Sequence, residues 1–263
     1  MRPSTEPFRS YVGTAGWAIP RESRPAFANA DGNSVLARYA SLLSATEINS
    51  TFYRRHREST FARWRVSVPP PFRFAVKLPR ALSHDAELTA PRALLREFLD
   101  DIRPLEEKLG VVLVQLAPSH AFDRRRALRF FSTLRALHDG AVVLEPRHST
   151  WFVSAARDLL ARAGVAYVVT DPARSSVDAL DRIDDDMRAP LYVRLHGAPR
   201  MYWSPYARAE LGALARRIAR CPSRDVWTIF DNTAAGAACA DALTFRAAMA
   251  SHPWRDDCKP PLG

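Results

Sequence analysis

Three chemically active side chains follow one apolar run in the middle of the chain. In the segment VVLEPRHSTW, residues 142–151, the run ends and Glu145, Arg147 and His148 come almost directly after it. An ionisable acid, a permanent cation and an imidazole are the residue types that general acid/base catalysis and anion binding use. Because a short apolar run predicts a buried strand, we expect these groups where a strand ends.

Polar residues close most of the other apolar runs as well. The residues at these ends, nearly all polar, are Gly16 and Trp17; Glu47, Asn49 and Tyr53; Lys77 and Arg80; Gln115; Asp171; Arg194 and His196; and Asp231 and Asn232. Burying a charge is costly unless it is paired or bound to a ligand. A buried ion pair, such as Glu145 with Arg147 or Arg194, explains any single residue as well as function does. Their concentration at strand ends favours a functional site, because stability requires no such grouping.

The apolar runs alternate regularly with helical patterns. Strands are predicted over residues 11–16, 45–50, 72–78, 111–116, 141–146, 166–171, 191–197 and 226–232. Helices are predicted over 34–43, 58–67, 91–110, 123–140, 153–164, 206–221 and 232–250, where apolar residues recur at i, i+3 and i+4. Gly110, Gly140 and Gly164 follow helix ends, which predicts left-handed C-caps. The acidic link 172–190 predicts at most a short or irregular helix.

Alternating strands and helices predict an α/β fold, and the number of units favours a parallel eight-stranded (β/α)8 TIM barrel. We expect a single domain over residues 1–263, with an ordered core from about residue 10 to 250. An open doubly wound sheet is the alternative, but GTAGWAIP after the first strand lacks the G-x-G-x-x-G turn. In a barrel the C-terminal strand ends converge, so the polar residues there predict an active site.

Four of these residues have the chemistry of acid/base catalysts, namely Glu47, Lys77, Glu145 and His196. Lys77 lies in FAVKLP, where apolar neighbours lower the pKa of an ammonium and make it available as a base, an acid or a Schiff-base former. The alternative is an ion pair with Glu47 on the adjacent strand. His196 is either a general acid/base or a histidine hydrogen-bonded across the barrel mouth. The predicted substrate-binding residues are Asn49, Tyr53, Gln115, Arg147, His148, Trp151, Arg194, Asp231 and Asn232.

Metal and sugar chemistry are weaker hypotheses. Ligand types for a divalent ion occur at Glu47, Glu145, Asp171, His196 and Asp231. The spacings H-x-H and H-E-x-x-H do not occur, and the lysine and arginines offer the carboxylates other partners. We therefore predict no metal ligand, and the sequence indicates no particular cofactor. A glycosidase pair would combine Glu47 with Glu145 or Asp231, and its signal is weak.

The last strand and the mouth loops offer two further features. The segment FDNTAAGAA predicts the start of the last helix, with Asn232 or Thr233 as its N-cap. Helix N-termini after the last two strands of such barrels commonly hold phosphate, although the small residues serve equally for close helix packing. Loop aromatics that would stack on a base or sugar, or pack as a lid, are Trp17, Trp151, Tyr202 and Trp203.

The net charge of +10 raises the question of nucleic-acid binding. The arginines are spread over predicted outer helix faces, so a diffusely charged surface is favoured over a nucleic-acid footprint. Cys221, Cys239 and Cys258 are widely spaced and form no C-x-x-C pair, which predicts structural thiols. No run approaches the length of a membrane span, and the N-terminal residues lack a signal-peptide pattern. We therefore expect a cytoplasmic protein without membrane contact.

Seven motifs are distinctive enough to compare with known families: GTAGW, EINSTFYR, FRFAVKLPR followed by SH, LGVVLVQLAPS, LEPRHSTW, YVRLHG and FDNTAAGAA. In order and spacing they resemble the DUF72 family of YecE-like proteins over nearly the whole chain. The resemblance implies a TIM barrel, while the activity of that family is unassigned. The family-like polar positions are Glu47, Asn49, Tyr53, Lys77, His84, Gln115, Glu145, Arg147, His148, Trp151, Arg194, His196 and Asn232. Ala15, Pro146 and Asp231 depart from the residues usual in the family, which implies a different fine substrate preference.

We therefore expect an enzyme that uses general acid/base chemistry on a small polar molecule, either anionic or polyhydroxylated. Glu47 and Glu145 would act as acid/base groups, Lys77 as a tuned base or electrostatic stabiliser, and His196 as a proton carrier. Hydrolase, lyase and isomerase activities stay open, as does the oligomeric state.

The arginines of the predicted mouth fit either of two hypotheses. In the enzyme, Arg147 and Arg194 would hold the substrate anion. In the alternative, a protein that binds nucleic acid or nucleotides, they would contact phosphates together with Arg80 while loop aromatics stack on bases. A metal-assisted phosphoesterase lies between the two.

Overall fold

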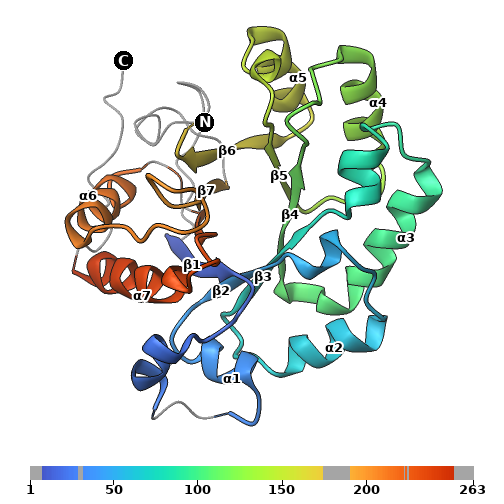
Figure 1. Ribbon diagram of the computed structural model, residues 1–263. Coiled ribbons are helices and arrows are strands. Elements are labelled where there is room, and N and C mark those ends of the chain that lie inside the picture. Colours follow the sequence, from blue (N-terminus) through green and yellow to red (C-terminus); the bar gives the residue numbers. More distant parts are fainter. Residues whose placement is uncertain (1–7, 29–31, 174–189, 222, 224, 252–263) are drawn as a thin grey trace.

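Eight parallel strands close into a barrel in the computed structural model of the chain (Figure 1). The strands are β1 (Arg9–Ala15), β2 (Ala45–Ile48), β3 (Arg73–Lys77), β4 (Leu109–Gln115), β5 (Ala141–Glu145), β6 (Val165–Asp171), β7 (Leu191–Leu195) and β8 (Asp225–Phe230). Each strand pairs with the next, and β8 pairs with β1. The structure describes residues 8–28, 32–173, 190–221, 223 and 225–251. The predicted (β/α)8 TIM barrel is confirmed.

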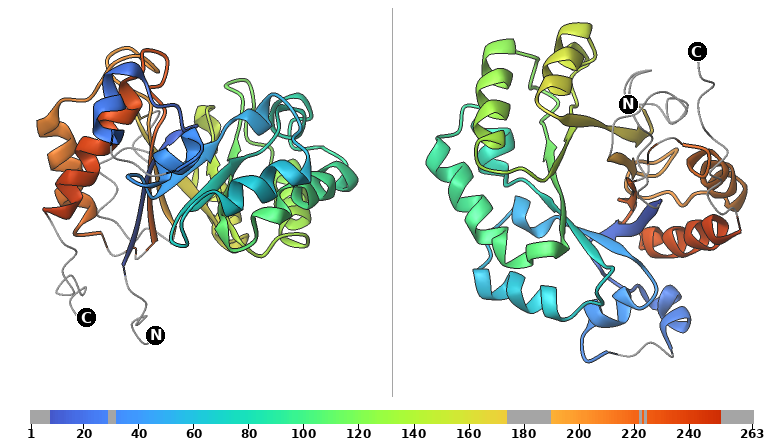
Figure 2. Two further views of the ribbon diagram at one scale, coloured as in Figure 1. Left: turned by 90° about the horizontal axis from the view of Figure 1, so that it is seen from below. Right: turned by 180° about the vertical axis from the view of Figure 1, so that it is seen from behind.

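Helices surround the barrel, with α2 to α5 along one side and α6 and α7 on the other (Figure 1, Figure 2). The helices are α1 (Val35–Ala40), α2 (Glu58–Val66), α3 (Arg92–Ile102), α4 (Arg124–Arg135), α5 (Ser154–Arg162), α6 (Arg208–Ile218) and α7 (Ala237–Ala250). The link between β6 and β7, where we expect a short or irregular helix, falls on residues 174–189, outside the described residues.

Short helical turns lie on four of the loops that leave the C-terminal strand ends. They are η1 (Arg21–Phe27) after β1, η2 (Ser50–Phe52) after β2, η3 (Ala81–Asp85) after β3 and η5 (Ser149–Trp151) after β5. These turns place loop side chains around the barrel mouth, which is where TIM barrels carry their active sites.

The helix predicted over 91–110 is shorter than expected. It ends at Ile102, and a separate turn, η4 (Arg103–Lys108), leads into β4. Pro104 has no backbone N–H with which to continue the α-helical hydrogen bonds. Glu106 then adopts a φ of 47°, which is outside the helical region.

Two of the three predicted glycine C-caps are wrong. Gly164, which follows α5, has the expected positive φ of 63°, whereas Gly110 and Gly140 do not have a positive φ. Gly110 lies inside β4, and a Cβ atom there would stand 2.3 Å from the indole of Trp227. That glycine therefore makes room for a core side chain rather than ending a helix.

The predicted N-cap of the last helix is also wrong. Helix α7 begins at Ala237 after Gly236, which has a φ of 82° and caps it without a side chain. The Asn232 amide is engaged elsewhere, because its Nδ2 donates to Asp241 Oδ2 at 2.7 Å and to the carbonyl of Ser204 at 2.9 Å. Thr233 lies in the turn that separates β8 from the helix.

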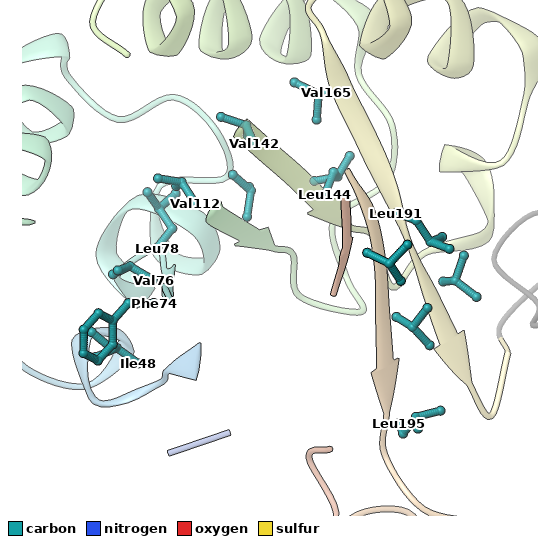
Figure 3. Packing of buried hydrophobic residues seen from close by; sticks show 14 of the residues in the cluster. Ile48, Phe74, Val76, Leu78, Val112, Val142, Leu144, Val165, Leu191 and Leu195 are labelled. Carbon is teal, nitrogen blue, oxygen red and sulfur yellow. The ribbon is translucent and has the colours of Figure 1, made fainter. Parts of the chain in front are cut away.

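One face of each strand packs against the surrounding helices. The buried residues of this outer layer include Ile48, Phe74, Val76, Leu78, Val112, Val142, Leu144, Val165, Leu191 and Leu195 (Figure 3). Because strands covered on both faces are apolar on both, they appear in the sequence as continuous apolar runs. This explains why the strands were predictable.

The other face of each strand points into the barrel. Its apolar cluster contains Tyr11, Ala45, Ala75, Val111, Leu113, Val143, Val168, Tyr192, Trp227 and Ile229. Side chains alternate between the two faces of a strand. The inward position at the C-terminal end of a strand therefore lies two residues after the last member of this apolar cluster on that strand. On β2 to β8 the residues there are Glu47, Lys77, Gln115, Glu145, Thr170, Arg194 and Asp231, all buried. The barrel interior is therefore apolar below and polar at its mouth, and we call these seven residues the polar layer.

Candidate active site at the mouth of the barrel

Arg194 of β7 is the centre of the polar layer. Its Nε and Nη2 donate to the Glu47 carboxylate at 3.1 and 2.7 Å. Its Nη2 also donates to Asp231 Oδ2 at 2.9 Å, and its Nη1 donates to Glu145 Oε2. The side chain is fully buried, at 0% exposure. One cation thus joins acids from β2, β5 and the end of β8.

Glu145 has partners on both of its oxygens. Besides Arg194 on Oε2, its Oε1 accepts from Gln115 Nε2 at 2.9 Å and from Arg147 Nε at 3.2 Å. Burial acts to raise the pKa of Glu145, but Arg194, His196 and Arg147 together hold it well below its ordinary value. Glu145 is therefore an ionised anchor for its neighbours at neutral pH.

His196 lies just after β7, between two of these acids. Its Nδ1 is 3.1 Å from Asp231 Oδ2, and its Nε2 is 3.5 Å from Glu145 Oε1. Burial acts to lower the pKa of His196, but Glu145 and Asp231 outweigh it and raise the pKa above the ordinary value. The imidazole therefore keeps its proton over a wider pH range than a free histidine.

Lys77, the last residue of β3, lies at the edge of the polar layer, in surroundings that differ from those of Arg194. It is only 8% exposed, its Nζ lies 4.1 Å from the centroid of the Phe52 ring, and it donates no hydrogen bond to any described residue. Burial and the nearby Arg194 lower its pKa to about 8, although three carboxylates of the layer oppose the shift. The Lys77 ammonium can therefore lose its proton close to neutral pH.

His84 of η3 lies on the same side of the mouth. Its ring is 4.8 Å from that of Phe52 and 6.1 Å from that of His120, and its Nδ1 is 3.0 Å from Ser83 Oγ. Burial and the nearby Lys77 lower the pKa of His84 to about 4. His84 is therefore a neutral imidazole at pH 7, and its pKa is shifted in the direction opposite to that of His196.

Two tyrosines also belong to the site. Tyr192 Oη donates to Glu47 Oε2 at 2.8 Å, a contact that sequence reasoning missed. A signal was available, because Tyr192 lies two residues before Arg194 and so shares its inward face. Tyr202, expected as a stacking or lid aromatic, accepts from Arg147 Nη2 at 2.7 Å and packs edge-on against His196.

Phe52 and His120 were missed as well. Phe52 contacts Lys77, while the predicted residue beside it, Tyr53, is 80% exposed. No sequence signal distinguishes neighbouring aromatic residues in a short helical turn. His120 is buried after β4, and its Nδ1 has no partner among the described residues.

Trp151 and His148 do not join the polar layer. Trp151 is buried beneath the mouth loops, where its Nε1 donates to the carbonyl of His120 at 2.9 Å. His148 caps η5, since its Nδ1 accepts from the backbone N–H of Thr150 at 3.3 Å. Both side chains hold loops in place.

The remaining predicted binding residues also lie outside the polar layer. Tyr53 points its ring to solvent, and Asn232 holds α7 through the hydrogen bonds given above. Asn49 is half-buried after β2, and its Oδ1 has no partner within the described residues. The structure thus joins Glu47, Gln115, Glu145, Arg147, Arg194, His196 and Asp231 in one network, with Lys77 at its edge.

Water reaches only the rim of this network. Asp231 is 9% exposed, and the Arg147 side chain is 16% exposed. A cavity of about 410 Å³ lies beside the mouth, between η2, η3 and α3, and Phe52 forms part of its wall. A ligand arriving from solvent would therefore meet Lys77, Arg147 and Asp231 before Arg194.

Three further findings concern the described residues as a whole. Among them, no three His, Cys, Asp or Glu side chains are grouped so as to hold a metal ion. None of their helices has the length and apolar character to cross a membrane. Cys221 and Cys239 are buried, and Cys258 lies outside the described residues.

Comparison with known proteins identifies the family. The model of a family described as "Protein of unknown function DUF72" matches residues 11–261. The chain belongs to the DUF72 family. The resemblance inferred from the seven motifs is thereby confirmed. Among curated proteins, the DUF72 chain is similar to the UPF0759 protein YecE of Escherichia coli strain K12, with 28% identity over 194 residues that cover 71% of this chain and 68% of YecE.

Solved structures agree with the fold of the DUF72 chain. A DUF72 family protein from Thermotoga maritima MSB8 superposes with a TM-score of 0.70 at 23% identity, covering 90% of this chain and 98% of the other. One from Enterococcus faecalis V583 gives a TM-score of 0.68 at 19% identity, covering 92% and 98%. The 3-keto-L-gulonate-6-phosphate decarboxylase of Vibrio cholerae gives 0.51 at 10% identity, covering 94% and 99%. At these identities the likeness concerns the fold alone.

Proposed function

We propose that this DUF72 protein is an enzyme that transfers a proton to or from a small polar molecule at the barrel mouth, with Lys77 as the group that gives or takes the proton. The substrate is anionic or polyhydroxylated. The supporting observation is the isolation of Lys77, whose side chain is only 8% exposed and whose Nζ lies against the Phe52 ring with no hydrogen-bond partner among the described residues. Such a cation lowers stability, which favours a role with a ligand over a role in packing.

The other polar residues divide into two groups in this proposal. Arg147 and Lys77 lie at the rim, where they can bind the anionic part of a substrate. Glu47 and Glu145 are positioning residues rather than the acid/base groups expected from the sequence, because Arg194 occupies both carboxylates. A general base needs a free oxygen and a pKa near the working pH, and Glu145 has neither.

Nucleic-acid binding ranks below this proposal. Of the three arginines expected on phosphates, Arg194 is fully buried, and Arg80 pairs with Asp85 at 3.0 Å. Arg147 donates to Glu145 and Tyr202. Contact of all three with one backbone would require the network to open.

The test combines ligand binding with proton exchange. A panel of sugar acids, hydroxy acids and sugar phosphates is screened by thermal shift, since a ligand at a hundred times its Kd stabilises by about 2.7 kcal/mol. Each hit is then incubated with the enzyme in D2O, and NMR follows deuterium entering the ligand. The wild type is expected to bind a member of the panel and exchange one of its protons.

Two substitutions at Lys77 separate binding from proton transfer. Lys77→Arg keeps the cation but cannot titrate, so binding should persist while exchange falls by about a hundredfold or more. Lys77→Met should lose both. Lys108→Met is the matched control, because Lys108 is a buried lysine outside the polar layer, and its Nζ bonds the carbonyl of Pro69. Exchange in Lys77→Met at the wild-type rate would refute the proposal, as would salt-sensitive binding of oligonucleotides alone.

A further inference from the structure

His84 lies beside Lys77 at the barrel mouth. It belongs to η3, the turn that follows β3, and it is half-buried. Its ring packs edge-on against Phe52, the residue whose ring also contacts Lys77 Nζ. Lys77 and Arg147, the two rim cations of the proposed function, both act on the His84 ring through their charge. His84 can therefore contact a substrate that reaches Lys77, and any role of His84 in binding rests on that proposed function.

A hydrogen bond to Ser83 determines which nitrogen of His84 carries the proton. The Ser83 hydroxyl has a single hydrogen, which Oγ donates to the carbonyl of Pro79 at 3.0 Å. The 3.0 Å contact between Ser83 Oγ and His84 Nδ1 is then a hydrogen bond that Nδ1–H donates. Because the imidazole is neutral at pH 7, it has no second N–H, and its Nε2 is an acceptor. No described residue donates to that Nε2.

The charges that act most strongly on His84 are positive. After burial, the causes that lower its pKa are Lys77, His120 in its protonated form, Arg147 and Arg80. Asp85, the acid on the same turn, pairs with Arg80 at 3.0 Å. His84 therefore presents a neutral acceptor nitrogen in surroundings that repel cations.

This combination selects one kind of ligand group for His84 Nε2. A carboxylate or a fully ionised phosphate has no hydrogen to donate to it. An ammonium can donate, but the cations around His84 oppose its approach. A hydroxyl group is a neutral donor, so it satisfies both conditions.

Arg147 supplies the complementary contact for an anion. Its Nε donates to Glu145 and its Nη2 donates to Tyr202, whereas its Nη1 donates to no described residue. A guanidinium with unused N–H groups at a partly exposed rim fits a carboxylate or a phosphate. One substrate can therefore present an anionic group to Arg147 and a hydroxyl group to His84.

We propose that His84 Nε2 binds a hydroxyl group of the substrate whose anionic group Arg147 binds, so that the substrate class is a hydroxylated carboxylate or phosphate. His84 is then a specificity-determining residue, and Lys77 keeps the proton transfer. A pKa of about 4 leaves His84 too weak a base for that step at pH 7.

The first test concerns the nitrogen atoms and needs no ligand. A long-range proton–nitrogen NMR correlation of the full chain at pH 7, assigned with His84→Gln, distinguishes protonated from unprotonated ring nitrogens. We expect the proton on Nδ1 and none on Nε2 of His84. A proton on Nε2 would overturn the proposal and leave the proposed role of Lys77 untouched.

The second test uses two matched pairs of probes, titrated into the full chain and followed by NMR. They are glycerate with propanoate, and glycerol 3-phosphate with propyl phosphate. The members of a pair share an anionic group and differ in their hydroxyl groups, and the two pairs distinguish a carboxylate from a phosphate. In at least one pair the wild type should bind the hydroxylated member about fivefold more tightly, as one net hydrogen bond provides.

Substitution of His84 should remove this preference. His84→Phe keeps a ring against Phe52 but has no acceptor, so the ratio of the two affinities should fall to about one. His84→Gln, which offers an amide oxygen, should restore part of it. The matched control is His138→Phe, because His138 is a half-buried histidine that precedes β5 at the opposite end of the barrel. That variant should keep the wild-type ratio.

The outcomes distinguish this proposal from the proposed function. No preference of the wild type for either hydroxylated probe, or an unchanged preference in His84→Phe, would overturn the hydroxyl site. A substrate whose deuterium exchange depends on Lys77 would still uphold the proposed function in that case. Conversely, unchanged exchange in Lys77→Met, together with a hydroxyl preference that depends on His84, would refute the proton transfer alone.

Discussion

The two sides of the barrel mouth differ in whether their buried cation has hydrogen-bond partners. Around Arg194, each of the three carboxylates accepts a hydrogen bond from the guanidinium. Around Lys77, the ammonium contacts the Phe52 ring and has no described hydrogen-bond partner. The two cations differ little in burial, since Arg194 is 0% and Lys77 8% exposed. Pairing rather than depth therefore distinguishes them.

The difference indicates which charges stabilise the fold and which are available for chemistry. Removing one partner from a saturated buried network leaves the others without compensation, which is strongly destabilising. Removing an unpaired buried cation relieves a desolvation cost. The two sides should therefore respond to substitution with opposite signs.

The largest effect is expected at the centre of the network. Arg194→Met leaves Glu47, Glu145 and Asp231 buried without their shared cation, so the free energy of unfolding should fall by about 3 to 5 kcal/mol or more. Urea unfolding, monitored by circular dichroism, measures this change in the free energy of unfolding. Arg126→Met is the control, because Arg126 pairs with Glu87 at 2.7 Å on the surface and should lose less than about 1 kcal/mol. Equal losses in the two variants would contradict the comparison.

A smaller effect of opposite sign is expected at Lys77. Its pKa is lowered from 10.5 to about 8, so below pH 8 the wild type bears the full cost of burying the charge. Between pH 8 and 10.5 the unfolded state holds a proton that the folded state has lost, and the wild type gains stability as pH rises. Relative to Lys77→Met, that gain should amount to about 2 to 3 kcal/mol. A stability difference between the two proteins that stays constant from pH 7 to 10.5 would contradict it.

The remaining prediction concerns the pKa values of the two histidines, His196 beside Arg194 and His84 beside Lys77. The pKa of His196 is raised, so its contribution to stability is complete below its unfolded pKa and is lost as pH rises through the folded pKa. The pKa of His84 is lowered to about 4, so its contribution has the opposite sign and falls as pH decreases below about 6.5. An NMR titration of the imidazoles, assigned with His196→Gln and His84→Gln, should find one pKa on each side of the ordinary value. Ordinary pKa values for both His196 and His84 would contradict the predicted difference between the two sides.

The fold and the position of the polar layer were predictable for one physical reason. Strands that are covered on both faces form apolar runs, and parallel strands bring their C-terminal ends to the same rim. Glu47, Glu145 and Arg194 could therefore be placed together although they lie far apart in the sequence. The ion-pair alternative considered for Glu145 accounts for its hydrogen bonds with Arg147 and Arg194.

The partnerships within the polar layer were not predictable, because they depend on side-chain reach and strand register. An ion pair of Lys77 with Glu47 was weighed, but Arg194 binds Glu47 instead. Phe52 rather than Tyr53 contacts Lys77, although the two rings are adjacent and pack edge-on against each other. Gly110 resembled a helix cap, although its role depends on Trp227 from a distant strand. Such contacts are set by tertiary packing.

The wide spacing of the Glu47–Arg194 pair has a consequence for synthesis. As the chain leaves the ribosome from its N-terminus, Glu47 emerges long before the cation that neutralises it. The early strands can associate through their apolar faces, but dehydrating Glu47 would remain unfavourable until residue 194 is available. Nascent half-barrels should therefore stay loose and hydrated at their upper rim, and that rim should become firm only when β7 joins them.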